Sequence, residues 1–362
     1  MSGAGSGGHL YPGVAVAQEI RRRHPRSRVV FAGIGRDLEV QPLRRLGFLL
    51  ERVHSAGLKG KSAGALLRGL SMLPLSAWDA WRVISRVSPH LVIGLGGYSS
   101  GAIVLIAALR RIPTMLLEQN AMPGITNRLL ARFVTAAAVS HEPTLSYFRG
   151  KGFLSGNPVR AGFFEPSPSS SVRRPALHLL VLGGSQGAHA INVALMAAAP
   201  LLVEASVPVV VTHQTGERDH GAVRQVYAEA GLAARVEPFL EQMADAMREA
   251  DIVVCRAGAT TLAELAAVGR AALLVPLPGA ADGHQRLNAD VLVRAGAAEV
   301  IPQEGMTGAV LAERLSQLAG DPERRRRMAA AARGLARPNA VRVIVDQAER
   351  LIWGGIQVGR CD

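Results

Sequence analysis

Apolar runs and amphipathic segments alternate along the first half of the chain. The apolar runs predict strands over Arg28–Ala32, Leu91–Gly94, Thr114–Leu117 and Thr135–Val139. The amphipathic segments before and between them predict helices over Val14–Arg23, Ala102–Arg110 and Thr126–Ala131. Strands that alternate with helices are typical of a parallel sheet that helices cover on both faces.

The same alternation begins again after a Pro- and Ser-rich segment, Pro166 to Pro175, which predicts a linker. Strands are then predicted over Leu177–Leu182, Val207–Thr212, Asp251–Cys255 and Ala272–Val275. A final amphipathic helix, Val341–Trp353, follows Pro338. We therefore expect two Rossmann-like, doubly wound α/β domains, residues 1–160 and 161–336, which face each other across a cleft. Residues 337–362 are expected to form a helix that packs back on the first domain.

The stretch from Leu91 to Leu109 contains no charged residue and is nominally long enough to cross a bilayer. Its middle, from Gly94 to Gly101, is rich in Gly and Ser, which is typical of a turn. We therefore predict a buried strand, a loop and a helix here rather than a membrane span.

Composition narrows the class of protein. The hydrophobic fraction of 49% supplies apolar surface for two cores, and the two cysteines, Cys255 and Cys361, suit a reducing compartment rather than a disulfide framework. The formal net charge is +13 and comes mainly from Arg. No zinc-finger spacing or RNA-binding signature accompanies that charge, so we expect no nucleic-acid partner, and the charge instead fits an anionic surface.

Three Gly-rich turns follow predicted strands or precede predicted helices: Gly3–His9, Gly94–Gly101 and Gly183–Ala188. Glycine lets the backbone approach a ligand closely, and a helix N-terminus offers free N–H groups to an anion. The first turn matches the G-x-G-x-x-G pattern of dinucleotide-binding proteins, which keeps an NAD site open as an alternative. No acidic residue closes the following strand at the usual spacing, which disfavours that alternative. Together the turns predict a bulky phosphorylated ligand.

Two further segments carry polar groups after predicted strands. A helix begins near Ala259, where its first amides suit a diphosphate and Glu264 suits ribose hydroxyls, although Glu264 could equally be a solvated carboxylate. The loop from Asp282 to Asn288 suits a sugar. No Asp-x-Asp pair occurs in the chain, so we expect no metal site and no cofactor, with helix N-termini stabilising the leaving group.

Several strings in this sequence resemble motifs of the MurG family of bacterial glycosyltransferases, and they occur in that family's order. They are GSGGHLYPGVAVA, GLGGYSSG, EQNAMPGITNRLLA, GNPVR, LGGSQGAHAIN, HQTG and CRAGATTLAELAAVGRAALLVPLP. The resemblance extends from residue 3 to about residue 300. It implies the GT-B fold and inverting transfer of N-acetylglucosamine (GlcNAc) from UDP-GlcNAc to the muramoyl 4-hydroxyl of undecaprenyl-linked lipid I, which gives lipid II in peptidoglycan synthesis. It also implies other cell-wall synthesis proteins as partners.

Residue by residue, the resemblance implies donor contacts in the first domain from Ser6, Gly7, Gly8 and Asn120. On the other side of the cleft it implies donor contacts from Arg160, Ser185, Leu240, Ala259, Thr260, Thr261, Leu262, Ala263, Glu264 and Gln285. Leu240 would act through its backbone on the uracil edge, Glu264 on the ribose and Gln285 on the GlcNAc hydroxyls.

His9 is the expected catalytic base, because a neutral imidazole at the acceptor side could take the proton of the attacking hydroxyl. The alternative, a structural or phosphate-binding role for His9, stays open. His213 is expected to shape the donor pocket, and Glu118 to have an architectural or donor-side role. His284 stands where the family often has glutamine, which puts its donor-sugar contact in doubt.

The segment Gly57–Ile84 mixes basic residues with Leu and Trp, which suits the interface of an anionic bilayer. An ordinary amphipathic helix with its leucines in the core is the alternative. Because the implied acceptor is bound to a lipid, we favour peripheral attachment to the cytoplasmic face of the inner membrane.

Two other functions remain open at this stage: a UDP-GlcNAc 2-epimerase-like enzyme of the same fold, and a non-catalytic nucleotide-sugar-binding protein. One further expectation concerns the start of the chain. In the MurG pattern an apolar strand precedes the first Gly-rich turn, whereas only Met1 and Ser2 precede Gly3 here. We therefore expect a misplaced start, with residues 1–8 poorly ordered or the protein destabilised.

Overall fold

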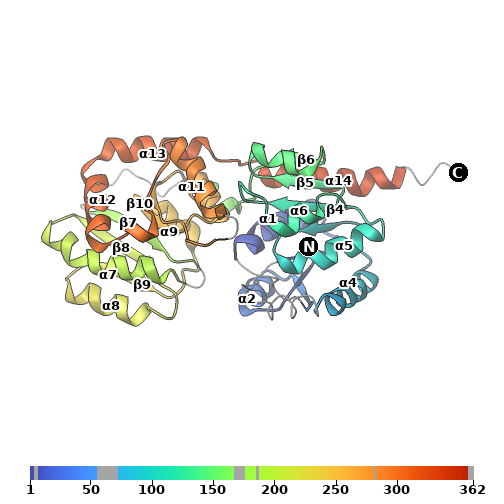
Figure 1. The fold of residues 1–362 in the computed structure, drawn as a ribbon, viewed down its shortest axis with the longest axis horizontal. Helices are drawn as coiled ribbons and strands as arrows, with labels where there is room; N and C mark the ends of the chain where they lie inside the picture. Colours follow the sequence, from blue (N-terminus) through green and yellow to red (C-terminus); the bar gives the residue numbers. More distant parts are fainter. Residues whose placement is uncertain (4–6, 55–71, 167–175, 185–186, 281–282, 358–362) are drawn as a thin grey trace. The chain divides into compact units, whose positions relative to one another are not determined.

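The computed structural model describes residues 1–3, 7–54, 72–166, 176–184, 187–280 and 283–357. The chain forms two compact units. Unit 1 comprises Met1–Arg160 with Arg337–Asp362, and unit 2 comprises Ala161–Ala336. Figure 1 labels most of the helices and many of the strands of the two units. Most of the linker predicted at Pro166–Pro175 lies outside the described residues, and the division between the units falls after Arg160, where the predicted domains 1–160 and 161–336 meet.

Unit 1 is built on a parallel sheet. Its strands are β1 (Val30–Gly33), β2 (Leu49–Arg52), β3 (Val92–Gly94), β4 (Thr114–Glu118), β5 (Ala136–Val139) and β6 (Gly152–Leu154). Strand β1 pairs with β2, and β3 to β6 pair in chain order. Ser2 bridges Ala32 of β1 and Gly94 of β3 in parallel, with Ser2 N–H donating to Ile93 O over 2.8 Å and Leu95 N–H donating to Ser2 O over 2.7 Å. Met1–Gly3 therefore take the position of a strand between β1 and β3.

Helices cover both faces of this sheet. Alternate strand residues point to opposite sides, so Met115 and Leu117 pack in a core with α1 (Gly7–Arg23) and α14 (Ala340–Gln357), whereas Leu116 packs in a second core under α4 (Leu73–Val87) and α5 (Tyr98–Leu109). The remaining helices are α2 (Asp37–Arg45), α6 (Ile125–Leu130) and the 3-10 helix η1 (Glu142–Phe148). The prediction of a doubly covered parallel sheet is confirmed.

Helix α1 begins at Gly7, seven residues before the predicted start at Val14. Glycine and proline are poor helix formers, and for that reason the sequence pattern missed the first two turns. Packing outweighs that local cost, since Leu10 and Val14 are fully buried in the core beneath the helix. The two glycines and His9 consequently lie in the first turn of a helix rather than in a loop.

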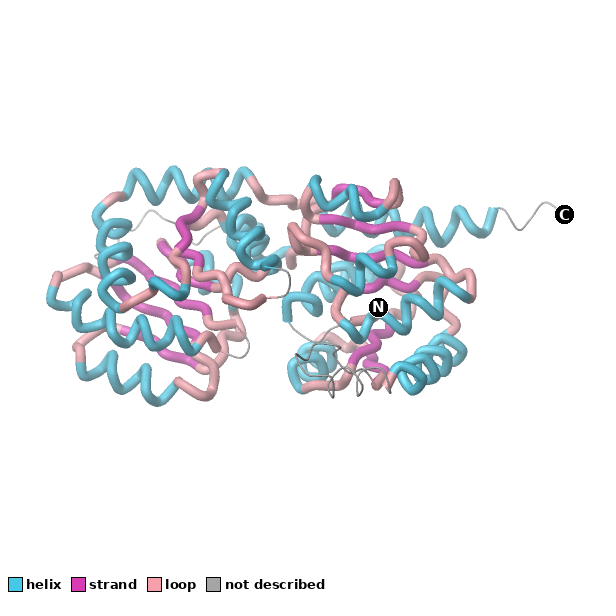
Figure 2. Tube along the Cα trace, in the orientation of Figure 1, coloured by secondary structure: helices cyan, strands magenta, loops and turns pink. Residues whose placement is uncertain are grey.

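Unit 2 contains a six-stranded parallel sheet of order β12-β11-β10-β7-β8-β9. Figure 2 shows the strands in magenta among the cyan helices. The strands are β7 (Leu177–Leu182), β8 (Val209–Gln214), β9 (Ala234–Glu237), β10 (Ile252–Cys255), β11 (Ala271–Leu274) and β12 (Ala298–Val300). The helices are α7 (His189–Glu204), α8 (His220–Glu229), α9 (Met243–Glu249), α10 (Ala259–Val268), α11 (His284–Arg294), α12 (Gly308–Gly320) and α13 (Pro322–Gly334), with 3-10 turns η2 (Ala161–Phe164) and η4 (Gln303–Gly305). The sequence pattern predicted the four buried strands and missed both edge strands, which are short and carry charged residues.

The uncharged stretch from Leu91 to Leu109 forms strand β3, a loop and helix α5, which confirms the prediction for this stretch. None of the helices within the described residues combines the length and apolarity needed to cross a bilayer.

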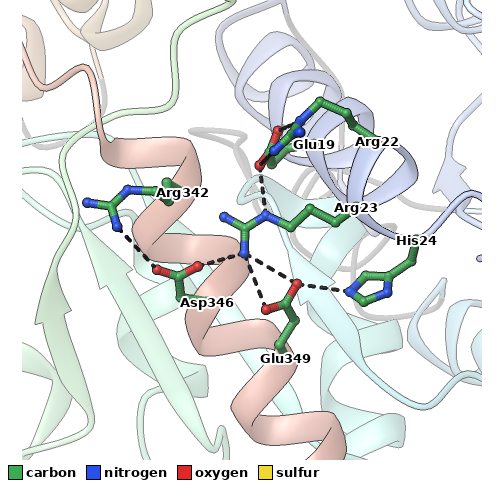
Figure 3. Close-up of polar contacts among 7 residues, drawn as sticks. All are labelled: Glu19, Arg22, Arg23, His24, Arg342, Asp346 and Glu349. Atoms are coloured by element: carbon green, nitrogen blue, oxygen red, sulfur yellow. Dashed lines mark hydrogen bonds and ion pairs between the residues drawn. The ribbon is translucent and has the colours of Figure 1, made fainter.

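Within unit 1, Arg23 joins the C-terminal helix α14 to helix α1 (Figure 3). At the end of α1, its guanidinium contacts Glu19 over 2.7 Å, Asp346 over 2.6 Å and Glu349 over 3.2 Å, and the last two carboxylates belong to α14. The three carboxylates raise the pKa of Arg23, and the hydrogen bond from Arg22 is the main cause that lowers the pKa of Glu19 to about 2. One cation thus compensates carboxylates on two helices that are more than 300 residues apart in the sequence.

We predict that Arg23→Met loosens α14, because it leaves three carboxylates close together without their shared cation. Hydrogen exchange of the α14 amides should accelerate by about tenfold, the scale of one lost charged hydrogen bond. The matched control is Arg22→Met, which removes a neighbouring, mostly exposed guanidinium that pairs with Glu19 on its own helix. Equal exchange in the two variants would contradict the account.

Candidate active site

Unit 1 has a topological switch point beside Met1–Gly3. The chain passes from there to β1 and β2 on one side and then returns to β3 on the other. Ligands of open α/β sheets bind outside the carboxyl ends of strands at such a point. Two segments flank this switch point: one leads into α1, and the other leads into α5.

His9 and Gly96 meet at this switch point. A Cβ atom on Gly96 would lie 2.8 Å from His9 Cδ2 and 3.1 Å from its Nε2, and Gly96 has a φ of +97°. Only glycine fits there, since both the backbone conformation and the closeness of the imidazole exclude a side chain. The half-buried His9 ring is thus packed against the turn that follows β3.

A buried carboxylate organises the next loop. Glu118, at the end of β4, accepts hydrogen bonds from Asn120 N over 3.0 Å, from Gly124 N over 3.0 Å and from Asn127 Nδ2 over 2.8 Å. Burial raises the pKa of Glu118, while these N–H donors act in the opposite direction. The side-chain amide of Asn120 also donates to Glu118 over 3.2 Å. Glu118 therefore has an architectural role in holding Asn120, one of the two roles expected for it.

Arg160 is the last residue of unit 1, in agreement with the predicted domain 1–160, although its implied donor contact was grouped with those of the second domain. Its guanidinium lies over the ring of Tyr11 on α1, 4.5 Å from the centroid, a cation–π contact that fixes its direction. Tyr11 was missed because a single aromatic residue in a Gly-rich segment carries no pattern. Ser6 lies outside the described residues, and Gly7 and Gly8 form the first turn of α1.

Unit 2 has its own switch point between β7 and β10, because the chain leaves β7 towards β8 and later returns to the other side at β10. Helices α7 and α10 begin after these two strands. The N-terminal amides of α10, from Ala259, therefore face the edge at which an anionic ligand would bind. Ser185, expected in the turn before α7, lies outside the described residues.

The expected donor residues on α10 differ in exposure. Thr260, Leu262 and Glu264 are buried, whereas the small side chains of the residues between them are half-buried. The charge of Glu264 acts on the thiol of Cys255 at the end of β10, where burial is the main cause that raises the thiol pKa to about 12. Glu264 is thus held close to the end of the strand rather than out in solvent, which answers the alternative of a solvated carboxylate.

Gln285 and Leu240 follow β11 and β9. Gln285 Oε1 accepts a hydrogen bond from Leu277 N over 2.9 Å, which orients its side chain across the loop before α11. Leu240 is buried, and its N–H donates to Gln214 Oε1 over 3.4 Å. Since all strands of this sheet are parallel, the predicted residues of unit 2 that are described follow strands ending at one edge of the sheet.

Comparisons with known proteins agree with this arrangement. Residues 1–139 match the glycosyltransferase family 28 N-terminal domain, and residues 178–346 match the glycosyltransferase family 28 C-terminal domain. A curated relative from Anaeromyxobacter sp. (strain Fw109-5) is 44% identical over 98% of this chain and 94% of its own length. A relative from Pelobacter propionicus is 42% identical over 96% of this chain and 97% of its own. Both are named UDP-N-acetylglucosamine–N-acetylmuramyl-(pentapeptide) pyrophosphoryl-undecaprenol N-acetylglucosamine transferase.

The chain belongs to the MurG family. The crystal structure of MurG from Acinetobacter baumannii superimposes with a TM-score of 0.73 at 32% identity, covering 96% of this chain and 97% of that one. The expected MurG resemblance and GT-B fold class are therefore confirmed. A UDP-GlcNAc 2-epimerase from Neisseria meningitidis, with a TM-score of 0.64 at 14% identity over 95% of this chain and 96% of that one, shares the fold alone.

His213, in the HQTG segment of this MurG-family chain, is fully buried. Asn192 Nδ2 donates to Thr215 O over 2.9 Å, so its Oδ1 is the acceptor for His213 Nε2 over 3.1 Å. The other ring nitrogen, Nδ1, then accepts from Tyr227 OH over 2.9 Å. Burial lowers the pKa of His213 to about 3, so the ring is a neutral structural group that ties α7 and α8 to β8. No three His, Cys, Asp or Glu side chains gather as a metal site would require among the residues that the structure covers.

We predict a pH-dependent stability of unit 2 that depends on His213. The unfolded chain protonates this ring below its ordinary pKa of 6.5, whereas the folded protein does so only near pH 3. The neutral His213 ring therefore makes its full contribution to the free energy of unfolding above pH 6.5. This contribution declines as the pH falls, by up to about 1.4 kcal/mol per pH unit. Hydrogen-exchange protection of β8 should fall between about pH 7 and about pH 5.5, and less so in His213→Gln. The same fall in both proteins would contradict this assignment.

Proposed function

We propose that this protein transfers GlcNAc from UDP-GlcNAc to the muramoyl 4-hydroxyl of lipid I and thereby forms lipid II, the product used in peptidoglycan synthesis. The observation that carries the proposal is 44% identity over 98% of the chain to a relative named as that transferase. The positions of the described candidate residues at the strand ends of each unit support it.

The proposed step is a single displacement. The acceptor 4-hydroxyl oxygen attacks the anomeric carbon of GlcNAc, the bond from that carbon to the diphosphate oxygen breaks, and UDP leaves. His9 takes the hydroxyl proton, a role that its place at the switch point of unit 1 supports. The charge that develops on UDP is stabilised by the N-terminal amides of α10, which offer N–H groups without a metal.

Donor contacts are proposed within each unit, taken by itself. Glu264 binds the ribose, the backbone of Leu240 binds the uracil edge, and Gln285 binds the sugar hydroxyls. The remaining proposed donor contacts are Ser6, Gly7, Gly8, Asn120, Arg160, Ser185, Ala259, Thr260, Thr261, Leu262 and Ala263. The epimerase alternative has only fold-level similarity in its favour.

Peripheral attachment to the cytoplasmic face of the inner membrane is the second part of the proposal. On α4, Trp78 and Trp81 stack with ring centroids 5.4 Å apart and are 59% and 48% exposed. Helix α5 packs against both α4 and α6, which also expose apolar side chains, Leu75 on α4 and Ile125 and Leu129 on α6. Stacked indoles that remain exposed suit the headgroup region of a bilayer. Of the basic residues expected in Gly57–Ile84, Lys59, Lys61 and Arg68 lie outside the described residues, and Arg82 lies on α4.

His9→Ala tests the catalytic assignment. We predict that turnover of UDP-GlcNAc and a lipid I analogue falls by roughly 10²–10⁴-fold, while the dissociation constant for UDP measured by calorimetry stays near that of the unaltered protein. The control is His90→Ala, which removes an exposed imidazole of the same unit. A His9→Ala variant that keeps its turnover and loses UDP affinity would assign His9 to binding instead.

Trp78→Ser combined with Trp81→Ser tests the membrane surface. Sedimentation with vesicles containing anionic lipid should show binding weakened by about tenfold or more, because two interfacial indoles are lost. Trp353→Ser is the matched control, since it removes an equally exposed indole from α14, 56% exposed, on the other face of the sheet. If the control weakens binding as much as the paired substitution, the surface is assigned wrongly.

A further inference from the structure

Gln214 connects two segments of the proposed donor site without belonging to either. It lies at the carboxyl end of β8, and its side chain is 1% exposed. Its Nε2 donates to Gly184 O over 2.7 Å, in the turn that follows β7. Its Oε1 accepts from Leu240 N over 3.4 Å, in the segment that follows β9.

The backbone around Gln214 brings the same two segments together. Gly183 N donates to Gln214 O over 3.0 Å, and Thr215 N donates to Glu237 O over 3.0 Å. Gly187, with a φ of +75°, packs so closely that a Cβ atom on it would lie 2.2 Å from Thr215 O. The turn after β7 and the segment after β9 are therefore both docked on the end of β8, with one buried amide between them.

A buried carboxamide is stabilising only if both its donor and its acceptor are satisfied. The Gln214 carboxamide makes one hydrogen bond as a donor and one as an acceptor. Together these two bonds fix the orientation of the Leu240 peptide relative to the Gly184 turn. We propose that Gln214 is a positioning residue that sets the selectivity of this protein for uridine nucleotides, by holding the base-recognising backbone of Leu240 at a fixed place relative to Gly184 after β7. This inference rests on the proposed function. Because Leu240 N already donates to Gln214, the Leu240 carbonyl is the backbone group left to read the base, and it can accept from the N3–H of uracil, whereas N3 of cytosine is itself an acceptor.

Two substitutions separate the two hydrogen bonds. Gln214→Leu removes both, so UDP affinity should fall by about tenfold and the preference for UDP over CDP should shrink by at least about fivefold. Gln214→Glu replaces the donor to Gly184 with an oxygen but keeps an acceptor for Leu240 N. It should therefore lower UDP affinity while it retains most of the preference for UDP over CDP.

The measurement is calorimetric titration of the full chain with UDP and with CDP, with thermal melting alongside. Gln225→Leu is the matched control, because it removes an exposed glutamine of α8 that donates to Glu229 in the same helix. A role in stability alone would lower the melting temperature of Gln214→Leu and leave its UDP-to-CDP ratio unchanged, and that result would overturn the inference. Failure of the unaltered protein to bind UDP would overturn the proposed function and this inference with it.

Discussion

In a parallel sheet every strand ends at the same edge, and each connection must cross back over a face of the sheet before the next strand begins. Both units of this protein obey that constraint, so the turns that follow their strands gather at one edge of each sheet. Where the order of strands reverses, two helices begin side by side, and their free amides have no neighbouring connection to cover them. The chemistry proposed for the protein depends on these two places.

Buried polar groups keep that edge in one conformation. Glu118 in unit 1 collects amide donors from the loop after β4, and the neutral His213 in unit 2 joins Asn192 of α7 to Tyr227 of α8. Removing one partner of such a network would leave a buried donor or acceptor unsatisfied, which costs more than the net contribution of the bond. These residues therefore act on the site through its rigidity, whereas His9 and Glu264 are proposed to act on the ligand.

Much of the fold and of the candidate site was predictable from the sequence, because continuous apolar strands and Gly-rich turns have strong local patterns. Strand β7 was predicted residue for residue, and the helix start at Ala259 follows from the small residues after Cys255. The failures have a physical cause. Helix α1 forms through Gly7 and Gly8 since tertiary packing of Leu10 outweighs propensity, and no sequence signal reports such packing. Gln214 stood within the HQTG match, but its two partners lie 30 and 26 residues away, so its role required the structure.

The proposed function is the transfer of GlcNAc to a lipid-linked acceptor. The most direct measurement incubates the protein with radiolabelled UDP-GlcNAc, with and without a lipid I analogue, and separates the products. The account predicts label in the lipid fraction and stoichiometric UDP only when the analogue is present. Release of UDP together with free N-acetylmannosamine in the absence of any acceptor, or donor binding without turnover in its presence, would contradict it.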